Sequence, residues 1–523
     1  MGLSSNATVT ESTQICMFDL RRGQYEGQEL DKILFFFPSD LPISTQLSVV
    51  GLSEGLITFT RIFSPEAACD VIEAELHSHV FYEAEPDIWM VMVIEKNVES
   101  EGIWRIDALK RVLKEIHSLF VMFQGPVRAL LDKEAGGGIA RSCLHSFIMD
   151  YLSALRKRSS LDLCCLDFFV GKKLQLPNFR DSLKERGTVQ MLTMGREAAI
   201  EVQSLIRVLE SCAGNISCYS MILFRNMLVS TTLSPEDSMS LFAYSVRRLS
   251  LGALSSGSTS SWSYLRKGTV ASQAVAANSG SIIDHPGSND SSLCGDRSTH
   301  VLRPLQPGKW MKGKDGFLVT NIWGTEPGNS VPNAPTIWLE KTEEKMYMCP
   351  FQHRNLTIIL LIPFTSISNV EQGISILKQQ MLEHASLKIL RVEEKLSKGW
   401  GGENAYHVSG YRYLLVDCDR NVSRASPPAK VTTLTKESLI ALSKLREEVD
   451  TEKKRGKWDG DRMQEKDLEI SVRAKNNAWA IARVTRGKEL YMVLEKANET
   501  LLYASDALEK FSNRYCNGAF SLD

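Results

Sequence analysis

The sequence lacks the features that mark secreted and membrane-spanning proteins. The N-terminus has no positively charged start followed by an apolar run, so no secretory signal is predicted. The longest apolar stretches, such as residues 356–364, are too short to span a bilayer. The 11 cysteines are scattered and contain no CxxC pair. A reduced, cytosolic protein is therefore expected.

The sequence also lacks an excess of charge of either sign. Lys and Arg number 61 against 62 Asp and Glu, a formal net charge of -1. Such a chain has no overall field to attract nucleic acid, so no nucleic-acid partner is expected. Two basic clusters, residues 156–158 and 453–455, are most typical of solvated helix ends. The alternative is a weak contact with an anionic membrane surface.

Recognisable catalytic motifs are missing as well. There is no GxSxG, no HExxH and no paired zinc-type cysteine motif. Residues 308–315 match the phosphate loop GxxxxGK, but Asp315 stands where a Ser or Thr hydroxyl must reach magnesium. A run with Glu73 and His79 is expected to be the wet face of one strand over residues 72–80, rather than a metal site. The sequence therefore predicts no covalent chemistry and no cofactor. A nucleotide-using enzyme is a third alternative, which rests only on the imperfect phosphate-loop match.

What is present is a large amount of patterned apolar sequence. The chain has 523 residues, 43% hydrophobic and 24% charged, which indicates about three folded domains. Composition and periodicity place them at residues 1–160, 185–396 and 405–523. Between residues 250 and 310 the chain is rich in Ser, Gly, Asn and Pro, which predicts a flexible insertion in the second domain.

The first and last domains share one order of predicted elements. Each has strand segments, a helix, a strand meander and a closing helix, separated by turn signals such as Asn476-Asn477. This order predicts an α/β fold of the α+β type, in which an antiparallel sheet is flanked by helices.

A helix predicted over residues 42–63 carries two apolar stripes. On a helical wheel, one stripe is solid and contains only apolar residues: Val49, Leu52, Leu56, Phe59 and Phe63. The roughly opposite stripe mixes apolar residues with two charges: Ile43, Leu47, Val50, Glu54, Ile57 and Arg61. Because one stripe suffices to dock a helix on its own sheet, we expect the solid stripe to pack inside. The mixed stripe is then either a protein interface or core of a larger domain.

Four runs in the first domain resemble the Ccz family in its plant form. They are residues 18–24, 29–37, 52–56 and 81–93, of which the last, FYEAEPDIWMVMV, is the most specific. The likeness is close through about residue 160, weaker around residues 223–249, and extends less clearly to the C-terminal domain. Such a resemblance implies three longin-like domains.

The resemblance also implies a function. A Ccz chain pairs with a Mon-type longin subunit, and the heterodimer is a guanine nucleotide exchange factor for a Rab of the Rab-seven type. The implied location is cytoplasmic, with recruitment to the late endosome, prevacuolar compartment and vacuole. By analogy the helix predicted over residues 42–63 lies at or near the surface that binds the GTPase. Together with the helical wheel, this places the expected partner or GTPase interface on the mixed stripe, and no catalytic residue is assigned. The alternative is a longin scaffold or tether without exchange activity.

Overall fold

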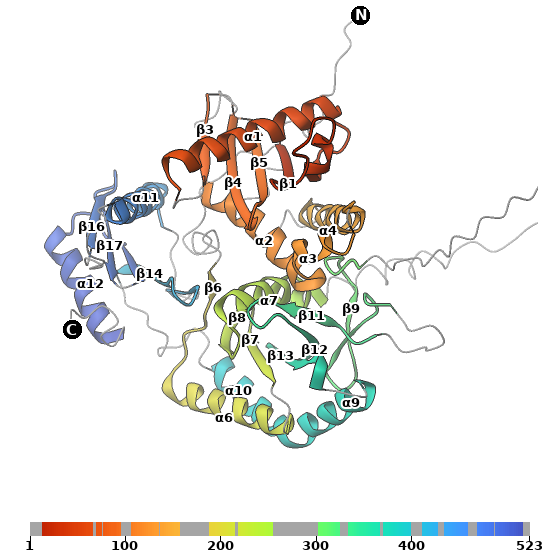
Figure 1. Ribbon diagram of the computed structural model, residues 1–523. Helices are drawn as coiled ribbons and strands as arrows, with labels where there is room; N and C mark the ends of the chain where they lie inside the picture. The colour runs from red at the N-terminus through yellow and green to blue at the C-terminus, as the bar shows by residue number, and fades with distance from the viewer. Residues whose placement is uncertain are drawn as a thin grey trace, which may run out of the picture.

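The computed structural model shows three units, each built around an antiparallel sheet with helices on its faces (Figure 1). The structure describes residues 13–65, 69–75, 77–95, 106–134, 136–156, 188–214, 218–254, 302–324, 333–366, 370–398, 410–426, 434–458, 468–485 and 487–515. Within these ranges, no helix is long and apolar enough to cross a membrane.

The first unit contains a five-stranded sheet in the order β2-β1-β5-β4-β3. Its strands are β1 (Thr13–Asp19), β2 (Ile33–Phe37), β3 (Val71–Glu73), β4 (His77–Glu85) and β5 (Ile88–Glu95). Helix α1 (Ile43–Phe63) covers one face (Figure 1). The other face is covered by α2 (Ile106–Gln124), α3 (Val127–Leu131) and α4 (Gly138–Arg156), and a 3-10 turn, η1 (Glu29–Lys32), precedes β2. The central strand β5 is apolar on both faces because helices cover both.

The second unit has another five-stranded sheet, in the order β11-β12-β13-β7-β8. Its strands are β7 (Tyr219–Phe224), β8 (Met227–Thr231), β11 (Thr336–Leu339), β12 (Glu344–His353) and β13 (Leu356–Pro363). A separate hairpin joins β9 (Trp310–Lys312) to β10 (Leu318–Thr320). The helical elements are α6 (Arg196–Cys212), α7 (Pro235–Arg248), η2 (Phe364–Ser366), α9 (Val370–Gln380), the π-helical turn η3 (Met381–Ala385) and α10 (Ser386–Lys398).

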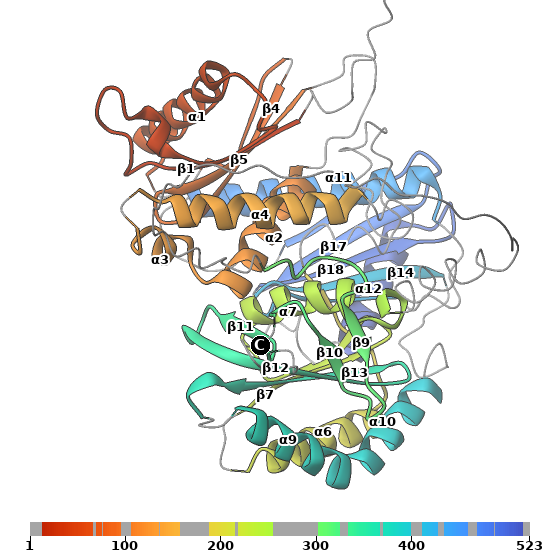
Figure 2. The same ribbon diagram turned by 90° about the vertical axis from the view of Figure 1, so that its right-hand side faces the viewer.

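The first two units are stacked so that their inner helices form a common layer (Figure 2). From one side to the other the layers are α1, the first sheet, α2 with α4, α7, the second sheet, and finally α6 with α9 and α10. A single hydrophobic cluster runs from the first sheet to the second; it includes Leu119 of α2, Phe147 of α4 and Tyr244 of α7. These units therefore share one core.

The third unit has a six-stranded sheet in the order β16-β17-β18-β14-β15-β6. Its own strands are β14 (Tyr411–Asp417), β15 (Val422–Ala425), β16 (Leu468–Arg473), β17 (Trp479–Thr485) and β18 (Lys488–Leu494). Helix α11 (Lys436–Trp458) packs on one face and α12 (Leu501–Tyr515) on the other, each over its own apolar cluster.

The sixth strand, β6 (Val189–Gln190), precedes the second unit in the chain and pairs with β15 in parallel. Val189 N–H donates to the Asn421 carbonyl at 2.8 Å, and Met191 N–H donates to the Ser423 carbonyl at 2.8 Å. The next residue, Leu192, donates its N–H to the Leu228 carbonyl of β8 at 2.7 Å. Residues 188–192, which we call the β6 staple, therefore join the edge of the third sheet to the edge of the second.

The α+β fold class predicted from the sequence is confirmed, but several elements differ. Residues 72–80 are not one strand, because a turn in which Ala74 N–H donates to the His77 carbonyl separates β3 from β4. Strands β12 and β15 were not predicted. The domain boundaries stay a prediction.

The predicted insertion is shorter than expected at its C-terminal end. Leu305 and Trp310 are buried, and the Trp310 indole donates to the Tyr244 hydroxyl of α7 at 2.8 Å. This buried contact holds the segment from residue 302 onward against the second unit. The prediction of flexibility for residues 255–301 lies outside the described residues.

Candidate partner-binding site

Helix α1 faces its sheet with small and β-branched side chains. Val50, Ser53 and Ile57 are its buried residues. The sheet beneath supplies the bulk, because the same hydrophobic cluster contains four large aromatic side chains: Phe18, Phe36, Phe81 and Trp89. Side chains of the helix must fit between these rings at close-packed density, which favours Val, Ser and Ile over Phe.

The charges on this side of α1 are paired within the first unit. Lys32 Nζ lies 2.7 Å from a Glu54 carboxylate oxygen. The Arg61 guanidinium lies 3.0 Å from Glu83 and stands over the Trp89 ring, 5.4 Å from its centroid. Glu54 and Arg61 are only half-buried and sit at the border of the packed face, so ion pairs with strand and turn residues accommodate them without deep desolvation.

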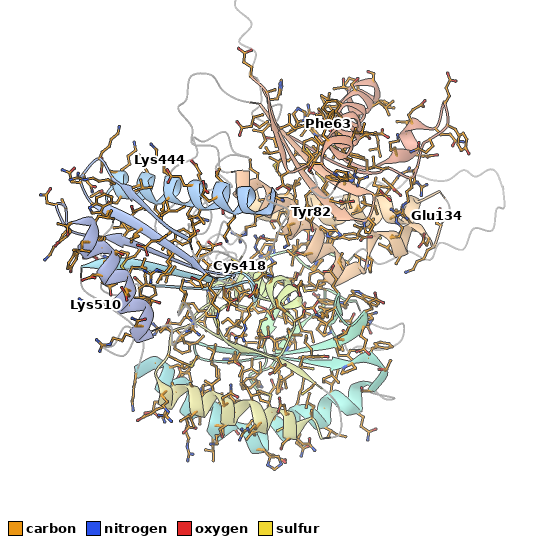
Figure 3. The ribbon with its side chains drawn as sticks, turned by 60° about the vertical axis from the view of Figure 1, so that its left-hand side comes forward. Phe63, Tyr82, Glu134, Cys418, Lys444 and Lys510 are labelled. Atoms are coloured by element: carbon orange, nitrogen blue, oxygen red, sulfur yellow. The ribbon has the colours of Figure 1, made fainter. Side chains whose placement is uncertain are left out.

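The opposite side of α1 is apolar and exposed. Leu52 is 54% exposed, Phe59 59% and Phe63 72%, while Leu56 is half-buried at the border. The Phe59 and Phe63 rings contact each other, with centroids 4.8 Å apart. We call Leu52, Leu56, Phe59 and Phe63 the outer stripe; Figure 3 labels Phe63 on α1. A contiguous apolar stripe on a helix that already has a packed face is typical of a protein-binding surface.

The expected orientation of α1 is therefore wrong. Leu52, Phe59 and Phe63 of the solid stripe point outward, while its Val49 and Leu56 are half-buried at the border and pack against the sheet cluster. The centre of the mixed stripe packs on the sheet: Val50 is 2% exposed and Ile57 0%. Counting apolar residues on a wheel could not decide the orientation, since the sheet selects residues by size and the two charges have partners nearby. The bulky residues that alternate along β1 and β5 were the signal in the sequence that could have predicted which stripe of α1 packs on the sheet.

The six residues predicted for the interface occupy different positions. Ile43 is exposed at the start of α1, Leu47 is half-buried, and the other four are placed as described above. Any role of these residues in a partner interface stays a prediction. The outer stripe offers the larger accessible apolar area.

The other candidate sites from the sequence are not brought together by the fold. Residues 308–315 belong to the β9–β10 hairpin, in which Gly313 N–H donates to the Phe317 carbonyl at 2.8 Å and strand β10, not a helix, comes next. A phosphate loop instead leads into a helix N-terminus, so its geometry is missing here. His79 is buried beside the Phe81 ring, and this burial lowers its pKa below the usual value.

Among the described residues, no group of three or more His, Cys, Asp or Glu side chains could hold a metal ion. Of the two basic clusters, Lys453 pairs with the buried Glu489. The rest of residues 453–455 and all three side chains of residues 156–158 lie outside the described side chains.

Comparison with known proteins agrees with the fold of the first unit. Residues 13–125 match a family model described as the first longin domain of INTU, CCZ1 and HPS4. This match covers the sheet of the first unit, α1 and α2.

Full-length relatives identify the whole chain. It is 63% identical over 524 residues to vacuolar fusion protein CCZ1 homolog A of Arabidopsis thaliana, covering 100% of both chains. It is 58% identical to the vacuolar fusion protein CCZ1 homolog of Oryza sativa subsp. japonica, again over 100% of both. A homolog from Nematostella vectensis is 22% identical over 97% of each chain. With a longin domain at its start and plant relatives this similar over their full length, the chain belongs to the vacuolar fusion protein CCZ1 family.

Proposed function

We propose that this protein is a subunit of a heterodimeric guanine nucleotide exchange factor that activates a late-endosomal Rab GTPase of the Rab-seven type. Its partner is a Mon-type longin subunit, and the complex acts in endosome-to-vacuole trafficking. The observation that carries the proposal is the outer stripe of α1, an exposed apolar face on the first unit. Because this unit matches the longin domain of a family that includes CCZ1, the outer stripe is the surface on which we expect the partner to bind.

The chemistry of exchange fits a chain without catalytic motifs. A GTPase holds its nucleotide with its own phosphate loop and Mg²⁺, so the factor need only bind the nucleotide-free state more tightly than the loaded one. Picomolar nucleotide affinity corresponds to about 16 kcal/mol, which demands a broad and well-packed surface. Two longin units placed side by side supply such a surface, and the outer stripe supplies its apolar centre.

The test measures partner binding and nucleotide release with the same variants. Phe59→Asp and Phe63→Asp place a charge on the exposed side of α1, so the chain should fold normally. Each should weaken binding of the Mon-type partner by about thirtyfold, as expected for an aromatic hot spot worth about 2 kcal/mol. Release of a fluorescent GDP analogue from the Rab should fall in parallel.

Two controls define the result. Leu387→Asp changes a residue that is 71% exposed on α10 of the second unit and should leave partner binding unchanged. Val50→Asp buries an unpaired carboxylate and should unfold the first unit. Partner binding that is identical in wild type and both Phe variants would move the assembly surface away from α1. Normal assembly without any acceleration of release would instead favour the scaffold or tether.

A further inference from the structure

The end of the third unit that points away from the other two combines exposed apolar and basic side chains. Cys418, directly after β14, marks the inner end of this sheet and lies toward the centre of the molecule (Figure 3). Tyr411, at the start of β14, pairs with Leu494 of β18, so the opposite end of the sheet, beyond Leu494, faces outward. Helix α12 begins at this outer end.

Three consecutive residues at the start of α12 are exposed. Leu501 is 43% exposed, Leu502 75% and Tyr503 48%. The following residues Ala504 and Leu508 are buried against the sheet, so α12 already has a packed face. The triplet Leu501, Leu502 and Tyr503 is not needed for that packing. The Thr500 hydroxyl accepts the Tyr503 N–H at 3.1 Å and holds this first turn in place.

Hydrogen bonds and a cation–π contact connect the start of α12 to two neighbouring elements. The Trp479 indole N–H donates to the Glu499 carbonyl, just before α12, at 3.0 Å. The Arg473 guanidinium lies over the Trp479 ring, 5.7 Å from its centroid. Asn476, in the β16–β17 turn, donates to the Thr435 hydroxyl in front of α11 at 2.8 Å. The starts of α11 and α12 and the β16–β17 turn therefore form one surface.

Exposed cations gather on this surface, although the whole chain is nearly neutral. Its exposed cations are Lys436, Arg473, Lys475 and Lys496. Of its acidic groups, Glu437 and Glu499 are half-buried and Glu495 pairs with the Arg412 guanidinium at 2.8 Å. Asp506, one helical turn after Leu502, is exposed and lies 3.8 Å from Lys510. We call Leu501, Leu502, Tyr503 and these four cations the third-unit tip.

We propose that the third-unit tip docks on an anionic membrane surface, inserting Leu501, Leu502 and Tyr503 between lipid headgroups. Three successive helical positions spread over about 200° of the helix circumference, so these side chains point around the helix end. A protein groove reads one stripe at i, i+3 and i+4 spacing, as on α1, whereas a bilayer surrounds a helix end from several sides. Leu inserts as the apolar anchor, Tyr favours the interfacial layer, and the cations meet acidic headgroups.

The tip differs from both basic clusters that the sequence singled out, and its docking does not require nucleotide exchange. The experiment is flotation of the purified full-length chain with vesicles of phosphatidylcholine, with or without phosphatidylserine. Wild type should float with the anionic vesicles and remain behind with the neutral ones. High salt should weaken the binding, because the cations are exposed.

Two pairs of variants separate the contributions of the tip. The double variant Leu501→Ser with Leu502→Ser should lower the vesicle partition coefficient at least about tenfold, since two leucines no longer leave water. Leu387→Ser, matched in exposure to Leu502, should have no effect. Lys436→Ala with Lys475→Ala should lower the coefficient roughly thirtyfold, at about fivefold for each cation. Lys398→Ala, an exposed lysine of α10, is its control.

All substituted residues are exposed, so the substitutions should not disturb folding. Unchanged thermal unfolding midpoints would show this, and a loss of vesicle binding could then not be attributed to unfolding. Equal flotation of wild type and both tip variants overturns the proposal. So does flotation of wild type with neutral vesicles at the same level. If the tip variants still bind vesicles but no longer co-purify with a protein that binds wild type at a fixed ratio, the tip binds a protein partner instead of a membrane. Partner binding and GDP release report separately on the proposed exchange function.

Discussion

The junction between the first and second units differs in kind from the junction between the second and third. At the first, α2, α4 and α7 contribute to one hydrophobic cluster that reaches both sheets. An ion pair between Arg247 of α7 and Glu115 of α2 crosses it, and Arg247 also stands over the Tyr151 ring of α4. At the second junction, the β6 staple supplies a few backbone hydrogen bonds and the Thr188 hydroxyl, which donates to the Ser423 hydroxyl at 2.9 Å. Its apolar part is small: Val189 of β6 is buried in the cluster, and Val422 of β15 packs against it.

The difference shows that units with similar layers need not be equally independent. A shared apolar core couples stability, because neither half can expose its face to water at low cost. A short parallel pairing contributes only about 1 kcal/mol for each hydrogen bond, so it positions a unit without determining whether that unit folds. We therefore expect the first two units to unfold together and the third to open separately.

The largest expected effect comes from a charge in the shared core. Leu119→Asp, at a residue of α2 that is 0% exposed, should cost more than about 4 kcal/mol and destabilise both adjoining units. Amide hydrogen exchange should accelerate in β12 and β13 as well as in β5. The matched change in the third unit, Leu508→Asp, should accelerate exchange only around α12 and its sheet. Unchanged protection of β12 and β13 in the Leu119 variant would contradict a common core.

A smaller effect is expected from the ion pair across the same junction. Arg247→Met leaves the Glu115 carboxylate partly buried without its Arg247 partner, which should cost about 2–3 kcal/mol and lower the thermal unfolding midpoint. Lys398→Met removes an exposed pair with Glu394 on α10 and should change stability by less than about 0.5 kcal/mol. If both substitutions shift the midpoint equally, the crossing pair is no stronger than a surface pair.

Breaking the β6 staple should cost less free energy than breaking the Arg247–Glu115 ion pair. Met191→Pro removes the N–H that donates to the Ser423 carbonyl and should cost about 1–2 kcal/mol. Hydrogen exchange should accelerate at β15 while the core strands of all three units keep their protection. Met191→Leu keeps the donor and is the control. Global loss of protection in the Pro variant would mean that the staple supports folding, contrary to the contrast between the junctions.

The smallest effect is expected away from both junctions. Lys314→Ala changes an exposed residue in the turn of the β9–β10 hairpin, so stability should change by less than about 0.5 kcal/mol. Titration with GTP or ATP should show no binding by either wild type or variant. Nucleotide affinity that depends on Lys314 would reinstate the phosphate-loop reading and would make this hairpin a third functional region.

Helix α1 shows how far sequence patterns reach. Its extent, residues 42–63 as predicted against Ile43–Phe63 as found, follows from helical periodicity bounded by Pro42 and Pro65. Its orientation does not follow, because two apolar stripes are equivalent until the shape of the opposing surface is known. The aromatic side chains of the sheet leave room for Val50 and Ile57 but not for a row of Phe residues.

By itself, the sequence determined the α+β class, the extent of α1 and the resemblance to the Ccz family, since these depend on local periodicity, turn residues and specific runs. Tertiary structure alone decided three other features: the outward direction of Phe59 and Phe63, the core shared by α2, α4 and α7, and the pairing of β6 with a strand more than two hundred residues away. Each depends on complementary shape or on hydrogen bonds between distant segments, and neither leaves a periodic signal within one segment.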